Sequence, residues 1–116
     1  MTTGWYGDLA SRLPLAITRA EYDGTTLLIA GPEWSFATIS AWRVSLNGVL
    51  RYGWSAPEAP AEIAKLVGGQ LISMQHQSSI IAADPAFELS TGEWLEVFAD
   101  HGADPWILEL RRSATA

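Results

Sequence analysis

Apolar and polar residues alternate along most of the chain, which is the pattern of strands that bury one face. In the C-terminal part, Phe87 and Leu89 alternate with polar neighbours, and Thr91-Gly92 predicts a short turn. The alternation continues over residues 93–99 and again over 106–110, where Pro105 suits the entry to a strand. We therefore expect three consecutive strands between residues 87 and 110.

The rest of the chain carries further strand patterns, over residues 15–22, 25–30, 33–39, 42–46, 49–54, 70–75 and 79–83. Asn47-Gly48 is the strongest turn signal, because both central residues of a type I′ turn need positive φ. It predicts that residues 49–54 fold back onto 42–46. Asp23-Gly24 predicts a similar hairpin between the first two strands.

Two stretches have helical spacing instead. Trp5, Leu9 and Leu13 recur at every fourth position before Pro14, which predicts a short opening helix. A second helix is predicted over residues 57–67, because Ser55-x-x-Glu58 has the pattern of a capping box and Gly68-Gly69 suits a helix end.

The two halves resemble each other. The Glu-Trp pair at Glu33-Trp34 recurs at Glu93-Trp94, and the strand that begins at Trp42 corresponds to the one that begins at Trp106. We expect a single α+β domain over residues 1–116, predominantly β, with pseudo-repeats at about 5–54 and 56–111. Each would hold a short helix and an antiparallel meander, packed as a sandwich or partly open barrel.

Composition changes this picture in two respects. The 116 residues include no cysteine, and the N-terminus lacks the basic and apolar regions of a signal peptide. No apolar run approaches the ~20 residues that span a bilayer. These features favour a soluble, cytoplasmic protein without membrane contact.

Charge is distributed unevenly along the chain. The net charge is −6, and residues 66–110 contain seven acidic residues and no lysine or arginine. Such a segment disfavours direct binding of nucleic acid and favours a basic protein partner. Acidic side chains that only keep a small domain soluble are the alternative.

Candidate chemistry is sparse. His76 and His101 are the only histidines, and the spacing of Asp100, His101 and Asp104 matches no metal site, so a solvated loop is the simpler interpretation. No nucleophile motif or phosphate loop is present. We therefore expect no enzymatic activity, no metal and no cofactor.

Aromatic residues give the clearest candidate site. Trp94 and Phe98 share a strand face with Glu96, opposite Leu95 and Val97. An aromatic pair beside acidic groups suits the docking of a cationic protein. A second layer or a dimer mate that covers this face is the competing interpretation.

The pattern Gly92-x-x-Leu95-x-Val97-x-x-Asp100, followed by Trp106-x-Leu108, resembles the closing hairpin of small actinobacterial domains similar to immunity proteins of polymorphic toxin systems. The chain departs from that group at Ala103-Asp104-Pro105, where a tyrosine and a glutamate usually stand. The resemblance implies a stoichiometric inhibitor of a toxin, often a nuclease with a basic cleft. The implied site comprises the charged residues Glu88, Glu96, Asp100 and Asp104 and the anchors Trp94 and Phe98.

Two other functions fit the sequence. One is a small-molecule-binding domain, with tryptophans that line a pocket between the two sheets. The other is a structural or regulatory homodimer that buries the Trp94–Phe98 face across a two-fold axis.

Overall fold

The computed structural model describes residues 10–76, 84–98 and 106–110. Its strands are β1 (Leu15–Ala16), β2 (Arg19–Tyr22), β3 (Leu27–Gly31), β4 (Trp34–Thr38), β5 (Trp42–Leu46), β6 (Val49–Gly53), β7 (Gln70–His76), β8 (Pro85–Leu89), β9 (Trp94–Val97) and β10 (Trp106–Leu110). Helix α2 spans Ala59–Ala64. Residues 5–9 of the predicted opening helix lie outside the described residues, as does the whole predicted strand over 79–83.

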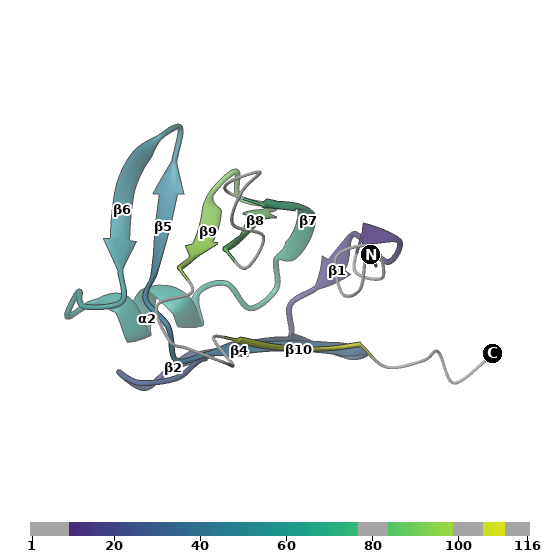
Figure 1. Cartoon of the computed structure of the whole chain (residues 1–116), viewed down its shortest axis with the longest axis horizontal. Coiled ribbons are helices and arrows are strands. Elements are labelled where there is room, and N and C mark those ends of the chain that lie inside the picture. Colours follow the sequence, from purple (N-terminus) through teal and green to yellow (C-terminus); the bar gives the residue numbers. More distant parts are fainter. Residues whose placement is uncertain (1–9, 77–83, 99–105, 111–116) are drawn as a thin grey trace.

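Two antiparallel sheets face each other, which confirms the predominantly β architecture. Sheet A has the order β1-β7-β8-β9-β5-β6, and sheet B has the order β10-β4-β3-β2. Figure 1 shows sheet B as a flat layer, with sheet A curving above it and α2 beneath β5 and β6. The sheets stay separate, so the described chain forms no closed barrel.

Aromatic side chains from both sheets meet in the core. Phe36 of sheet B lies edge-on against Phe87 of sheet A, with ring centroids 4.9 Å apart. Tyr22 of β2 meets Trp42 of β5 in the same way at 5.0 Å. Trp42 is 1% exposed and lies in the core, whereas Trp106 packs against the core only partly buried. These contacts fix the two sheets against each other, because edge-to-face aromatic pairs add to the energy of burial.

The expected strand over 15–22 is wrong in one respect, because the chain changes sheet within it. Leu15–Ala16 pairs with β7 in sheet A, while Arg19–Tyr22 pairs with β3 in sheet B. The buried positions shift from odd numbers at Ile17 to even numbers at Ala20, which marks the crossing. The indole Nε1 of Trp34 donates a hydrogen bond to the carbonyl oxygen of Ala16 at 2.9 Å and ties the crossing to sheet B.

Each sheet joins a three-stranded meander from one half of the chain to strands from the other half. In sheet B, β10 pairs with β4 at the edge of the meander β2-β3-β4, and in sheet A, β5 pairs with β9 of the meander β7-β8-β9 and is followed by β6, while β1 lies on the other side. After β4 the chain leaves sheet B to enter sheet A, and after β9 it makes the opposite crossing. We call this arrangement the strand exchange.

Turn chemistry follows the sequence closely at the β5–β6 hairpin. Asn47 and Gly48 have φ of 54° and 78°, as a type I′ turn requires. The capping-box prediction is wrong, because the N-cap residue of α2 is Glu58 and makes no side-chain cap hydrogen bond. Gly68 has φ of 97°, which confirms the predicted left-handed position after the helix.

The tryptophans of the two Glu-Trp pairs differ in how deeply they are buried, so the proposed correspondence does not extend to burial. Trp34 is 3% exposed and faces the core, whereas Trp94 is half-buried on the opposite side of its sheet from Leu95. Helix α2 is also the only complete helix within the described residues. The two helix-plus-meander repeats therefore remain a proposal.

Candidate functional site

Four of the six predicted partner-binding residues lie on the outer face of sheet A. Glu88 of β8 stands opposite Trp94 of β9 in the register, and Glu96 follows Trp94 on the same face. Phe98 comes directly after β9, and its N–H donates to the carbonyl oxygen of Ala41 at 2.9 Å. All four side chains are half-buried. Asp100 and Asp104 lie outside the described residues.

Glu96 is paired with an arginine from the other half of the chain. Arg43 of β5 donates from Nε to Glu96 Oε1 at 2.7 Å, and the hydroxyl of Ser45 donates to the same oxygen at 3.3 Å. The Arg43 guanidinium also lies over the Phe98 ring, 5.0 Å from its centroid. This geometry suits a cation–π contact. Glu96 thus presents less net charge to a partner than the sequence suggests.

The strand exchange explains why Glu96 is paired with an arginine. It also brings an arginine close to a second carboxylate, that of Glu93. Arg51 of β6 lies 3.4 Å from Glu93 Oε2 through its Nε. The acidic residues stand in the second half of the sequence, yet β5 and β6 carry two arginines from the first half into sheet A. The charge asymmetry along the chain is therefore reduced in space.

Glu88 keeps its charge on this face. The hydroxyl of Ser73 donates to Glu88 Oε1 at 2.7 Å, and the structure records no cationic partner for Glu88 within the described residues. A neutral hydroxyl leaves the carboxylate its negative charge. Beside Trp94, Glu88 is thus the acidic group of this face that remains available for a basic partner.

A hollow of about 470 Å³ adjoins Phe98 and Arg43 at the edge of sheet A. Gly53 stands opposite Arg43 in the register and has no side chain, which opens the hollow between the two strands. Leu50 and Trp54 border it, with 63% and 52% of their surfaces exposed. We call this hollow, with Arg43, Leu50, Gly53, Trp54 and Phe98, the β6 groove.

Trp54 is the functional candidate that the sequence pattern did not single out. It is the most exposed of the described tryptophans, and its carbonyl oxygen accepts a hydrogen bond from the Tyr22 hydroxyl at 2.8 Å. No sequence signal marked it, because only the fold places the strand before it at the edge of sheet A. Exposed tryptophans near the centre of a surface often dominate binding energy.

The interior between the sheets offers little room for a small molecule. The gap bounded by Ile29, Phe36, Phe87 and Leu95 is too small to hold a water molecule. This packing does not favour the alternative of a tryptophan-lined pocket between the sheets. Among the described residues, no group of three or more His, Cys, Asp or Glu side chains is arranged to hold a metal ion.

No known protein family, curated protein or solved structure matches the chain. Within the described part of the chain, no helix is long and apolar enough to cross a membrane.

Proposed function

We propose that the chain is a non-catalytic protein-binding module that docks a basic partner on the outer face of sheet A. The observation that carries the proposal is the convergence of Glu88, Trp94, Glu96 and Phe98 on this one face. Half-buried aromatic rings supply contact area with little loss of side-chain freedom, and Glu88 supplies an unneutralised carboxylate.

The β6 groove extends this surface at its edge. Leu50 and Trp54 add exposed apolar area next to the Arg43–Phe98 stack. Aromatic and apolar anchors surrounded by polar groups are the usual composition of an energetic centre in a protein interface. The net charge of −6 would speed the approach of a basic partner at low salt.

The resemblance to immunity proteins supplies the narrower form of the proposal. In that form the partner is a toxin, for instance a nuclease, and the chain occupies its basic cleft as a stoichiometric inhibitor. Carboxylates on the docking face would stand where phosphates of the substrate lie. The net charge of −6 and the position of Glu88, beside Trp94 on the docking face, support this form.

The test is an affinity capture with the purified chain as bait, from a lysate of its own organism, at low and at high salt. We expect a basic protein that binds at low salt and is released at high salt. The same capture is then repeated with Glu88→Lys and Trp94→Ser, and with Glu33→Lys as a control of equal charge change on the exposed β3–β4 turn. The proposal predicts loss of capture with the first two variants only.

Association kinetics with the captured protein give the sharper measurement. Glu88→Lys should slow association about tenfold at low salt and flatten its salt dependence, since rim charges act mainly on the on-rate. Retention of the wild-type rate by Glu88→Lys and Trp94→Ser together would refute docking on this face.

We also propose that the two meanders arose by duplication. Ile29 pairs with Phe36 across β3–β4, and Phe87 pairs with Leu95 across β8–β9, so buried residues occupy equivalent places in both meanders. The reciprocal strand exchange supports the same idea. Superposition of β2-β3-β4-β10 on β7-β8-β9-β5 tests it, and failure of the four strands to align in the same order and direction would reject it.

A further inference from the structure

The outer face of sheet B is organised in two rows of side chains. The register places Arg19, Ala30, Ser35 and Glu109 in one row across the four strands. The second row holds Glu21, Leu28, Ala37 and Ile107. We call these eight residues the outer face of sheet B.

Charge on this face is confined to its two edges. The inner strands β3 and β4 contribute only small or aliphatic uncharged side chains, at Leu28, Ala30, Ser35 and Ala37. Ile107 on β10 is 58% exposed, and no described segment covers the face in Figure 1. A flat, uncharged centre of this kind allows close approach of another sheet.

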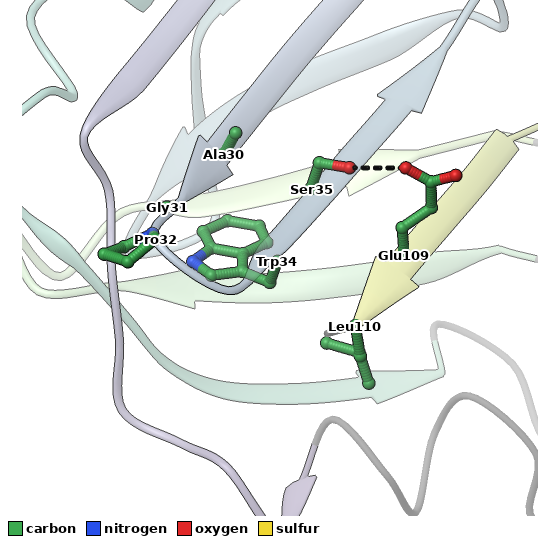
Figure 2. A pocket seen from close by; sticks show the side chains of 7 residues that line it. All are labelled: Ala30, Gly31, Pro32, Trp34, Ser35, Glu109 and Leu110. Atoms are coloured by element: carbon green, nitrogen blue, oxygen red, sulfur yellow. Dashed lines mark hydrogen bonds between the residues drawn. The ribbon is translucent and has the colours of Figure 1, made fainter. Parts of the chain in front are cut away.

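The two ends of the first row are complementary. At one end a hollow of about 700 Å³ is bordered by Pro32, Ser35, Glu109 and Leu110. Figure 2 shows Glu109 and Ser35 side by side there, with the Ser35 hydroxyl 3.4 Å from Glu109 Oε1. The structure records no cation beside Glu109 among the described residues. Pro32 and Leu110 give the hollow apolar surface and Glu109 gives it a carboxylate, which together suit the stem and head group of a long cationic side chain.

Such a side chain projects at the opposite end of the same row. The Arg19 side chain is 59% exposed and is paired with Glu21, whose carboxylate lies 2.9 Å from its Nε. Exposed pairs of this kind contribute little energy, so the guanidinium is free to take a second carboxylate. Its planar set of five donors has room for both.

We infer that the outer face of sheet B binds a second copy of the chain, with Arg19 of each copy seated in the Glu109 hollow of the other. A two-fold axis parallel to the strands, between β3 and β4, places β2 of one copy over β10 of its partner. The axis leaves each row opposite itself, so Arg19 faces Glu109 and Ala30 faces Ser35 across the interface. The contact is isologous, and both charge pairs form at once. It also leaves the outer face of sheet A open, so this inference does not depend on the proposed function.

The size of the outer face of sheet B sets the expected affinity of the dimer. Four strands about 4.8 Å apart and four residues of about 3.3 Å each cover roughly 15 Å by 13 Å. A stable interface needs about 800 Å² from each partner. We therefore expect a weak dimer, with a dissociation constant of roughly 0.1–1 mM and a clear dependence on salt.

Sedimentation equilibrium of the full chain from about 10 µM to 1 mM tests the inference across the expected range of dissociation constants. Arg19→Glu and Glu109→Lys should each weaken dimerisation at least about tenfold, because each creates two like-charge contacts. Both residues are exposed on the surface, so folding is expected to survive, and circular dichroism checks it. Glu58→Lys, an equal charge change on the exposed start of α2, should leave the dimer unchanged.

The decisive step mixes the two weakened variants. In a mixed pair, the two substituted positions face each other with opposite charges, and the remaining contact is the native Arg19–Glu109 pair. Dimerisation should return when the Arg19→Glu and Glu109→Lys proteins are combined, and also in the double variant. A wild-type chain that stays monomeric to 1 mM, a dimer unaffected by either substitution, or variants that fail to restore it would each overturn the inference.

Discussion

Arg43 and Glu96 stand opposite each other in the β5–β9 register, and their side chains meet at 2.7 Å. The two residues are 53 positions apart in the sequence, so the pair exists only because β5 enters the sheet of the second half. The Arg43 side chain is 50% exposed and that of Glu96 is 20% exposed. The pair therefore sits at the boundary between a surface ion pair and a buried one.

Arg43→Ala should lower the free energy of unfolding by about 1 kcal/mol, because it removes the partner of Glu96 and the stack on Phe98. Urea denaturation at neutral pH measures the change. Lys65→Ala is the matched control, since Lys65 caps the end of α2, pairs locally with Glu62 of that helix and has a side chain that is 70% exposed. We expect that control to cost under ~0.5 kcal/mol. If both substitutions lower the free energy of unfolding equally, the Arg43–Glu96 pair stabilises the fold no more than the exposed Lys65–Glu62 pair does.

Tyr52 should make stability fall at alkaline pH. Burial raises the pKa of its hydroxyl most, and the negative charges of Glu93 and Glu62 raise it further, while Arg51 opposes them. The folded chain therefore keeps this proton at pH values where the unfolded chain, with a tyrosine pKa of about 10, loses it. The contribution of the protonated Tyr52 hydroxyl to the free energy of unfolding is fully present below pH ~10. It is lost as the pH rises above that value, with a limiting slope of about 1.4 kcal/mol per pH unit.

Urea midpoints between pH 8 and pH 11 measure this effect. Tyr52→Phe has no proton to lose at this position, so its stability should decline less steeply over the same range. Parallel pH profiles for the wild type and Tyr52→Phe would contradict the assignment.

Gly31→Ala should destabilise the fold through steric overlap. A Cβ atom on Gly31 would collide with the carbonyl oxygen of Ala16 and with the indole nitrogen of Trp34, which are already joined by a hydrogen bond. We expect a loss of about 1–3 kcal/mol, typical of overpacking. Gly53→Ala is the comparison, because the nearest atom to its new Cβ lies 3.3 Å away. Thermal unfolding of both variants should show the larger loss for Gly31→Ala, and the reverse order would contradict the geometry.

Local features of the fold were predictable from the sequence. The Asn47-Gly48 turn brings β5 and β6 together within a few residues, so its outcome depends on little else. The side of β9 that faces the core also followed from alternation, since Leu95 and Val97 are buried. Which strands pair with each other could not be predicted. For example, β10 pairs with β4 across about seventy residues, and the alternation within a strand carries no information about its partner.

The candidate site was also predictable only in its local features. Strand parity alone places Trp94 and Glu96 on one face, as the fold confirms. The neutralisation of Glu96 was not predictable, because it requires knowing that β5 lies beside β9. The exposure of Trp54 was hidden for a similar reason, since its strand becomes exposed only by standing at the edge of sheet A.

The strand exchange bears on how the chain is made. Sheet B cannot be completed until β10 reaches β4, so a growing chain on the ribosome leaves the edge of β4 unpaired until β10 has been synthesised. Contacts so distant along the chain slow folding, because a long loop must close before the pairing stabilises it. Synthesis and folding of sheet B are thus coupled at β10. Premature termination before Trp106 would release a chain with an open edge of Trp34, Phe36 and Thr38, which is a template for aggregation.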